Sequence, residues 1–386
     1  MAILKKKLSF VYEKAKQEIE AQILDGRLKA GDCVLSVNAI CSIYGITRRS
    51  ARWAIENLMR KGLLYRRPGK GTFVSSLKSG TGNRIAEFSI ALIIPDISDL
   101  FILKICEGIQ AAANQYNCNL VIKTSNGDID RENQNIHYSI QRQEDGVIIF
   151  PNYGRFNVEE LWRLKDSGLP FVLIDRYFED IDTNYVGVDN IRGGYLATSH
   201  LIRLGHRRIA HLYGSRGSAN DGRLAGYRQA LSDNEIPCNE KWIRRFEDLA
   251  LKSGGSRFEP DVECGYENMK HLLRFSEIPT AVFAGNDYQA LGAVKAIKEQ
   301  RLRIPEDIAI VGFDELTINP FLEIPLTTIR QPQYEIGRNA VEILLRKIAE
   351  QDTGKRASTE RIILPVELVI GASCGAKCRK RRHGWA

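Results

Sequence analysis

Residues 193–233, GGYLATSHLIRLGHRRIAHLYGSRGSANDGRLAGYRQALSD, decide the fold, because a helical stretch, a short apolar strand and a second helical stretch follow one another. We expect helices over 193–204 and 223–233, with the strand over 209–213 between them. A strand flanked by helices at this spacing is the repeating unit of a parallel sheet that is covered by helices on both faces. The fold class is therefore α/β.

The same alternation continues on both sides of this stretch. Further strands are expected at 89–94, 119–123, 147–150, 171–174, 281–284 and 309–313. Further helices are expected at 103–116, 131–142, 161–166, 263–274 and 288–299. Two successive sets of such units predict two doubly wound lobes, with a ligand bound between them at the carboxyl ends of the strands.

Length and composition limit the class of protein. The chain has 386 residues, 44% hydrophobic and 26% charged, which is enough for two or three domains with full cores. Its eight cysteines have no paired spacing, as is typical of reduced thiols. The N-terminus shows no secretion signal, and no apolar run approaches the roughly 20 residues of a spanning helix. We therefore expect a cytoplasmic protein without a membrane partner.

Charge is distributed unevenly along the chain. Residues 1–84 contain 17 Lys and Arg against 6 Asp and Glu, whereas the remainder contains 38 against 41. A small basic module joined to a larger acidic one favours a nucleic-acid-binding unit on a body that has another task. Charge alone leaves open that the two are simply solvated surfaces of different composition.

The first 75 residues, called the head below, show the pattern of three helices and a hairpin. The expected elements are helices over 8–24, after Ser36 and over 48–61, and strands over 63–67 and 71–74. Ser36 and Thr47 can cap the second and third helices, and Gly45 breaks the chain between them. Two helices joined by a tight turn, of which the second presents its first turns to a partner, form a helix-turn-helix.

The start of the third helix and the tip of the hairpin carry the chemistry for binding DNA. Guanidinium groups can pair bidentately with guanine or clamp phosphates, hydroxyls add donors, and a basic tip rich in glycine fits a minor groove. The candidates are Thr47, Arg48, Arg49, Ser50, Arg52, Gly69, Lys70 and Gly71. Three arginines in five residues are more often a solvated helix face, but the turn before them and the basic hairpin behind them favour DNA.

These candidates belong to a longer series of residues in the head. The series is Gly31-Asp32, Ile46-Thr47-Arg48, Arg52, Ala54, Leu58, Gly62-Leu63 and Arg67-Pro68-Gly69-Lys70-Gly71-Thr72-Phe73-Val74. In these residues the head resembles the GntR-type winged helix-turn-helix. The resemblance implies that Arg48, Ser50 and Arg52 contact DNA and that Gly69 lies at the wing tip.

One departure from that family concerns the second helix. The family usually has Pro-Ser-x-Arg before this helix, and the chain has Leu35-Ser36-Val37-Asn38 instead. Ser36 and Asn38 are therefore further candidates for DNA contact. Since Asn38 stands where a DNA-contacting arginine is common, we expect a different operator sequence.

Polar residues follow the expected strands of the body, residues 87–372. They are Asp96, Asp99, Asp175, Arg176, Asn286, Asp287 and Asp314. Each aspartate or asparagine could cap the next helix, as Asp287 would cap the helix at 288–299, whereas Arg176 needs an acceptor. Paired donors and acceptors that converge with the aromatic ring of Phe101 suit a polyol.

A long ordered series of motifs runs through the body. They occupy 94–98, 145–148, 174–176, 188–190, 200–202, 204–210, 223–227, 279–283, 286–287, 290–292, 304–307, 311–314 and 326–332. In these motifs the body resembles the effector domain of the LacI/GalR repressors and the periplasmic sugar-binding proteins of type I. The positions that match this family's sugar site are Asp99, Phe101, Asp175, Arg176, Arg223, Asn286, Asp314 and Gln331. Leu100 and Ile102 replace a common Pro and a second Phe, which leaves the identity of the sugar open.

The resemblance also implies how the chain is divided. It predicts crossings between the lobes near residues 189, 331 and 361, so that lobe one holds about 87–188 and 333–360 and lobe two about 189–331 and 361–372. Residues 76–86 are expected to be a flexible linker. Residues 373–386 are expected to be a disordered basic tail, in which Cys374 and Cys378 have no second pair of ligands for zinc.

Head and body together predict a transcriptional repressor that resembles hybrids of the arabinose-repressor type. A homodimer would bind double-stranded operator DNA, and a small sugar between the lobes would control its affinity by hinge closure. No metal, cofactor or catalytic residue is expected. Sensing of a purine or a sugar phosphate is the first alternative. A sugar-acting enzyme would need catalytic motifs that the sequence does not show, and a transport receptor would need a secretion signal.

Overall fold

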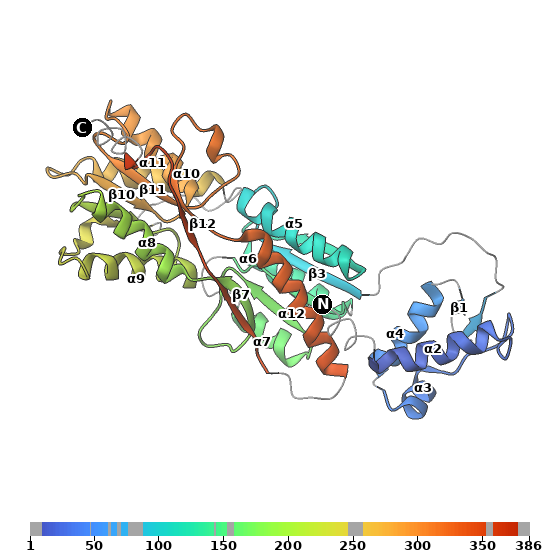
Figure 1. The fold of residues 1–386 in the computed structure, drawn as a ribbon. Coiled ribbons are helices and arrows are strands. Elements are labelled where there is room, and N and C mark those ends of the chain that lie inside the picture. Colours follow the sequence, from blue (N-terminus) through green and yellow to red (C-terminus); the bar gives the residue numbers. More distant parts are fainter. Residues whose placement is uncertain are drawn as a thin grey trace, which may run out of the picture.

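The computed structural model (Figure 1) describes residues 10–46, 48–60, 63–67, 71–75, 88–142, 144–152, 158–245, 258–352 and 358–376. It shows two α/β lobes and a small helical head with a hairpin. Among the helices of these residues, none is long and apolar enough to cross a membrane.

The described part of the head contains the predicted helices and hairpin. The elements are α2 (Phe10–Leu24), α3 (Val37–Tyr44), α4 (Arg48–Arg60), β1 (Leu64–Arg67) and β2 (Gly71–Val74). The two strands pair antiparallel, with Leu64 opposite Val74. Ile19 of α2 packs with Ile55 and Leu58 of α4 in one small core. The apolar side chains along one face of these helices are therefore the ones that are buried.

The boundaries of α3 follow from its ends. The Ser36 hydroxyl accepts a hydrogen bond from the backbone N–H of Ala39 at 3.2 Å, which satisfies one of the free donors of the first turn. Gly45 ends the helix in the left-handed region at a φ of 62°. The predicted cap and the predicted break are both confirmed.

Lobe one is a parallel sheet of six strands. Its strands are β3 (Phe88–Ile94), β4 (Cys118–Thr124), β5 (Gly146–Ile149), β6 (Phe171–Ile174), β7 (Asn184–Val188) and β13 (Arg361–Leu364), in the order β13-β7-β6-β5-β3-β4. Its helices are α5 (Leu100–Gln115), α6 (Ile129–Gln141), α7 (Val158–Asp166) and α12 (Gln333–Asp352). Successive residues of β3 point to opposite faces, so that Ile90 packs in the core that contains residues of α5 and α12, and Ala91 in the core that contains residues of α6 and α7. The lobe is doubly wound, as predicted.

Lobe two repeats this plan. Its strands are β8 (Ile209–Leu212), β9 (Ile243–Arg244), β10 (Ala281–Ala284), β11 (Ala309–Asp314), β12 (Thr327–Arg330) and β14 (Glu367–Val369), in the order β14-β12-β11-β10-β8-β9. Its main helices are α8 (Asn190–Arg203), α9 (Ser218–Ser232), α10 (Phe258–Leu272) and α11 (Asp287–Glu299). All strand pairs are parallel except β12 with β14. The parallel strands end at the same edge, which faces lobe one.

The third crossing between the lobes differs from the prediction. The family resemblance implied a crossing near residue 361, but β13 pairs with β7, with Arg361 opposite Tyr185, and so belongs to lobe one. The chain enters lobe two only with β14, where Leu368 lies opposite Ile329. The crossing therefore lies between Leu364 and Glu367, and the strand that carries it runs along both lobes (Figure 1).

Residues 373–376, which were predicted to belong to a disordered tail, are part of lobe two. Ser373 donates a hydrogen bond from its hydroxyl to the carbonyl of Ile310 at 2.7 Å, and its own carbonyl accepts one from the N–H of Ile310. Cys374 is buried, with its sulfur 2.9 Å from the Thr327 hydroxyl and 3.2 Å from Nε2 of His200. Residues 373–376 therefore complete lobe two, because small side chains fit between β11, β12 and α8. Residues 377–386, which include Cys378, lie outside the described residues.

Candidate functional site

Seven polar residues predicted for the effector site are buried where the strands end. They are Asp99, Asp175, Arg176, Arg223, Asn286, Asp314 and Gln331, each at most 6% exposed, and are called the inner cluster below. Buried charges and amides require partners. The partners of these side chains therefore define the site.

Arg223 is the centre of the lobe-two half of the inner cluster. Its Nε donates to Oδ1 of Asn190 at 2.9 Å, and its Nη1 donates to the carbonyl of Gly285 at 2.6 Å. Its Nη2 lies 3.8 Å from Oδ1 of Asp314, and the guanidinium stacks over the ring of Phe313 at 3.8 Å. Each of the three guanidinium nitrogens has an oxygen atom as its partner, so the plane of the guanidinium is fixed.

Close packing of two helices sets the position of Arg223 on α9. A Cβ on Gly194 of α8 would lie 2.1 Å from the backbone carbonyl oxygen of Arg223. Only glycine allows α8 and α9 to approach this closely. The arginine is therefore held by its backbone as well as by its side-chain partners.

Asp314 and Gln331 form a second pair in the inner cluster. Nε2 of Gln331 donates to Oδ1 of Asp314 at 2.7 Å. Oε1 of Gln331 has no hydrogen-bond partner in the described part of the chain. A buried carbonyl oxygen without a donor costs about 1–3 kcal/mol, so this atom is an acceptor that a ligand hydroxyl could satisfy.

Asp175 and Arg176 form the lobe-one half of the inner cluster, directly after β6. Asp175 has a φ of 65°, and its carbonyl accepts a hydrogen bond from the Tyr185 hydroxyl at 3.0 Å. Nη1 of Arg176 donates to the carbonyl of Pro151 at 2.7 Å, and its Nε lies 3.4 Å from Oδ2 of Asp175. The acceptor that the sequence required for Arg176 is thus a backbone carbonyl together with the neighbouring carboxylate. Burial, and the nearby carboxylate of Asp175, raise the pKa of Tyr185, which keeps its hydroxyl as a donor.

Asn286, and not Asp287, caps α11. Oδ1 of Asn286 accepts from the N–H of Gln289 at 2.8 Å, and its Nδ2 donates to Oδ2 of Asp261 at 2.8 Å. The predicted cap Asp287 is the first residue of the helix and accepts from the Thr328 hydroxyl at 2.7 Å. Burial raises the pKa of Asp287 to about 7, although this hydrogen bond opposes the shift.

Two lobe-one candidates lie at the start of α5. Asp99 caps the helix, because its Oδ1 accepts from the N–H of Phe101 at 2.8 Å. Phe101 packs in the core of lobe one, edge-on to Phe150 with ring centroids 6.3 Å apart. The predicted aromatic face is thus turned into the core and does not line the open cleft.

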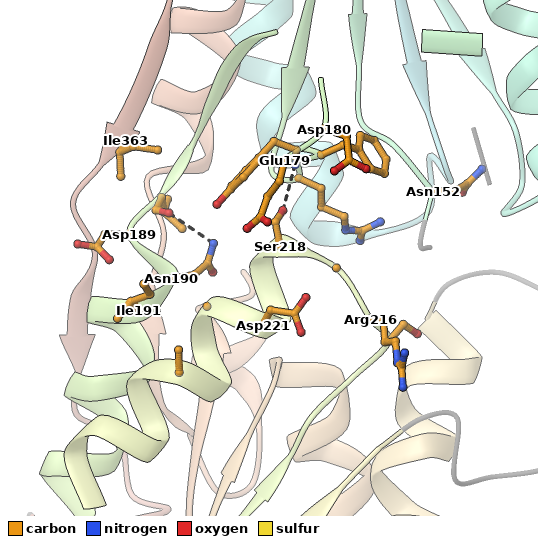
Figure 2. A pocket seen from close by; sticks show the side chains of 18 residues that line it. Asn152, Glu179, Asp180, Asp189, Asn190, Ile191, Arg216, Ser218, Asp221 and Ile363 are labelled. Carbon is orange, nitrogen blue, oxygen red and sulfur yellow. Dashed lines mark hydrogen bonds between the residues drawn. The ribbon is translucent and has the colours of Figure 1, made fainter. Parts of the chain in front are cut away.

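An open cleft of about 1010 Å³ lies between the lobes beside the inner cluster (Figure 2). Arg176 of the inner cluster lines it from lobe one, and Asn190, the partner of Arg223, lines it from lobe two. The backbone N–H of Tyr177 in lobe one donates to the Ser218 hydroxyl of lobe two at 3.0 Å, which Figure 2 shows as a dashed line. Among the predicted effector residues, Arg176 alone lines the open cleft.

The rim of this cleft is acidic. Glu179, Asp180, Asp189 and Asp221 line it from three segments, together with the cations Arg176 and Arg216 (Figure 2). Within the described residues, no group of three or more His, Cys, Asp or Glu side chains could hold a metal ion. Carboxylates accept hydrogen bonds and guanidinium groups donate them, so the side chains of the rim can bind hydroxyl groups.

The candidate DNA-binding residues are only partly described. Arg48 and Arg52 are one helical turn apart on α4 and exposed, and Ser36, Asn38 and Gly71 are also exposed. Thr47, Gly69 and Lys70 lie outside the described residues, as do the side chains of Arg49 and Ser50. Arg67 of β1 lies over Tyr65 and Phe73 at 5.4 Å from each ring centroid, which fixes a further cation on the hairpin.

Three partners of the inner cluster were not among the residues predicted from the sequence. Asn190 accepts from Arg223, Asp261 accepts from Asn286, and Tyr288 donates to Asp99 at 3.3 Å. Asn190 could have been found, because it follows the end of β7 in the motif 188–190. Asp261 and Tyr288 lie inside helices and carry no signal in the sequence pattern.

Two family models match the chain. The bacterial regulatory proteins of the gntR family match residues 11–74, and the periplasmic binding protein-like domain matches residues 198–374. The two models fall on the head and on the second half of the body.

Known proteins are similar to this chain over most of its length. The arabinose metabolism transcriptional repressor of Geobacillus stearothermophilus is 30% identical over 370 residues, which cover 95% of this chain and 98% of that protein. The ribose operon repressor of Haemophilus influenzae is 34% identical over 269 residues, 69% of this chain and 76% of that protein. The crystal structure of a LacI family transcriptional regulator from Enterococcus faecium with bound ribose is 26% identical, with a TM-score of 0.60, and covers 74% of this chain and 98% of its own.

Proposed function

The chain belongs to the family of bacterial transcriptional repressors that join a GntR-type head to a periplasmic-binding-protein-like body. From this family membership we propose that a small sugar, bound between the two lobes, controls the affinity of the protein for operator DNA. Relatives named for arabinose and ribose support a sugar as effector. Because an operator is chromosomal DNA, the protein would act in the cytoplasm.

The inner cluster is the observation that carries this proposal. It places two arginines, three carboxylates and two carboxamides at the strand ends of the two lobes, beside the open cleft that Arg176 lines. Neighbouring hydroxyls of a sugar act as donor and acceptor together, so such paired groups can bind them bidentately. The free Oε1 of Gln331 offers one acceptor that a hydroxyl would satisfy.

The charge of the cleft favours an uncharged sugar over a sugar phosphate. Four carboxylates line the rim against two arginines, and Arg176 already lies against Asp175 and Pro151. A phosphate brings about two negative charges, and the four exposed carboxylates of the rim repel it. A purine would stack on an aromatic ring, and although the ring of Phe101 is buried in the core of lobe one, Tyr177 and Phe178 line the cleft, so a purine is the alternative that the screen must test.

For DNA, we propose that a homodimer presents two α4 helices to successive major grooves of a pseudo-palindrome. Arg48 and Arg52 lie on the same exposed face of α4 and would reach base edges or phosphates. One head of this size makes too few contacts for tight specific binding, which favours a dimer. We expect no turnover of sugar, since the relatives are transcriptional regulators.

A thermal-shift screen tests the effector class. The full chain is heated with L-arabinose, D-ribose, D-ribose 5-phosphate and adenine, and the Arg223→Ala variant is the control. A ligand at 100 times its Kd adds about 2.7 kcal/mol of stability, so a true effector raises Tm by several degrees in the wild type but not in the variant. If D-ribose 5-phosphate or adenine raises Tm and neither free sugar does, the effector is a sugar phosphate or a purine and the proposal of a free sugar is wrong.

A further inference from the structure

We propose that Tyr288 is a positioning residue of the effector site, whose hydroxyl ties lobe two to the start of α5 in lobe one and holds Asp99 in place. The proposal rests on the proposed function, because that function makes Asp99 an effector residue. It adds a residue inside α11 that no sequence motif of the site includes.

The Tyr288 hydroxyl makes two hydrogen bonds between the lobes. It accepts one from the backbone N–H of Leu100 at 2.9 Å, and it donates one to Oδ1 of Asp99 at 3.3 Å. Tyr288 lies in the first turn of α11, whereas Asp99 and Leu100 open α5. The phenol oxygen of Tyr288 is thus hydrogen-bonded both to the Asp99 carboxylate and to the first backbone N–H of α5.

The N–H of Leu100 needs an acceptor from outside its helix. It belongs to the first residue of α5, and the first N–H groups of a helix have no partner within the helix. The cap residue Asp99 already accepts from Phe101 at 2.8 Å. In the described structure the only acceptor for the Leu100 N–H is Tyr288, which therefore completes the cap from the other lobe.

The tyrosine ring is buried in the core of lobe one although it belongs to lobe two. Tyr288 is 1% exposed and packs in the same apolar cluster as Phe101 and Ile102. Leu316, also from lobe two, joins this cluster. The carboxylate of Asp287 accepts from the N–H of Leu316 at 3.0 Å, so one short segment of α11 fixes both apolar contacts.

These contacts exist only while the lobes are close together. Separating the lobes would expose the ring and transfer the hydroxyl and the Leu100 N–H to water. A contact made only in the closed arrangement shifts the equilibrium toward that arrangement. A sugar bound by both lobes needs the same arrangement, so Tyr288 raises the affinity for the effector.

The test compares the full-length Tyr288→Phe variant with Tyr227→Phe. Both substitutions remove one hydroxyl from a fully buried ring, but the Tyr227 hydroxyl donates to the carbonyl of Ile209 at 2.8 Å within lobe two. Hydrogen exchange of the ligand-free protein reports the Leu100 amide in peptides over residues 97–103. Titration with L-arabinose and D-ribose reports the affinity for the effector.

We expect Tyr288→Phe to speed exchange in that peptide by about fivefold and to weaken sugar binding about 2- to 10-fold, the effect of one hydrogen bond. Tyr227→Phe should lower Tm and change neither readout. Unchanged exchange, or unchanged sugar affinity, in Tyr288→Phe would overturn the proposal, as would equal effects in both variants. If neither sugar binds the wild type, the proposed function fails, and exchange alone decides whether Tyr288 joins the lobes.

Discussion

The head and the body use arginine in opposite ways. Arg48 and Arg52 of the head are exposed, whereas Arg176 and Arg223 of the body are nearly inaccessible and directed by backbone carbonyls and amides. Exposed cations attract a polyanion over a distance and release its counterions. The buried cations lie next to carboxylates that offset their charge at a distance, but their fixed geometry can select among neutral hydroxyl groups. Arginine can therefore serve two kinds of recognition: exposed arginines bind a polyanion, and buried arginines select hydroxyl groups of a small ligand.

Removing the central arginine of the inner cluster should have the largest effect. Arg223→Ala leaves Asp314 and Asn190 buried without this donor, and breaking a buried pair costs about 3–5 kcal/mol. We expect effector affinity to fall by more than 100-fold in calorimetric titration. On the same helix, Arg228→Ala removes an exposed pair with Glu240 and should change affinity less than threefold. Equal losses in both variants would contradict the role of burial.

A substitution in the core of the head or of the body should affect the function of that region alone. Leu58→Ala opens a cavity in the small core of the head, at a cost of about 2–5 kcal/mol, whereas Leu164→Ala does so in lobe one. Leu58→Ala should abolish operator binding and keep the thermal shift with sugar. Leu164→Ala should lower the Tm of the body and, at temperatures below it, keep operator binding. Electrophoretic mobility shift and thermal melting measure the two properties on the same samples, and loss of the sugar response in Leu58→Ala would show that the regions do not fold independently.

A surface substitution in the head should have a smaller effect. Arg52→Ala should weaken operator binding by about 1–3 kcal/mol and relax discrimination at one base position, if this residue reads a base edge. Arg27→Ala removes an exposed pair with Asp25 in the same head and is the control. Binding to operator and to scrambled DNA at two salt concentrations measures both variants. A loss that is equal for both DNA sequences would make Arg52 a phosphate contact.

The pH dependence of stability should show the smallest effect, from two buried groups in lobe two with opposite signs. The pKa of Asp287 is raised by burial to about 7, so between about pH 4 and 7 the folded state keeps a proton that the unfolded state has lost, and stability falls as pH rises. The pKa of His211 is lowered by burial to about 4, so between about pH 4 and 6.5 the unfolded state keeps the proton, and stability rises with pH. The two slopes oppose each other.

When one of the two groups is substituted, the change of the unfolding free energy with pH should therefore reflect the other group. Relative to the wild type, Asp287→Asn should gain stability as pH rises from 4.5 to 6.5, and His211→Gln should lose it, each by on the order of 1 kcal/mol per pH unit. Urea unfolding at several pH values measures these differences. Parallel pH profiles for both variants and the wild type would show that neither group titrates as its burial requires.

The order of elements could be predicted because apolar runs and helical stripes repeat at regular spacing. The strand at 171–174 has the predicted position, and Ile55 and Leu58 lie in the helix that was predicted over 48–61. β7 could not be predicted from its apolar content, since Asn184, Tyr185 and Gly187 interrupt the run. It is a strand because β6 and β13 pair with it on both sides.

The candidate site could be predicted only as a set of strand ends. Arg223 and Gln331 stand at the positions that family resemblance gave, but their partners Asn190 and Asp314 meet them through the tertiary fold. The third crossing and the end of the body were misplaced for the same reason. β13 is fixed by its pairing with β7, and Cys374 by contacts with residues far away in the sequence.

The most direct test of the account is operator binding across a sugar titration, with the wild type and Arg223→Ala side by side. The sugar is whichever of L-arabinose and D-ribose gives the larger thermal shift. We predict that the wild type loses operator affinity as the sugar rises, while Arg223→Ala binds operator with or without it. Release of the operator by Arg223→Ala at the wild-type sugar concentration would contradict the proposed site. A rise of wild-type affinity with sugar would contradict the proposed direction of control.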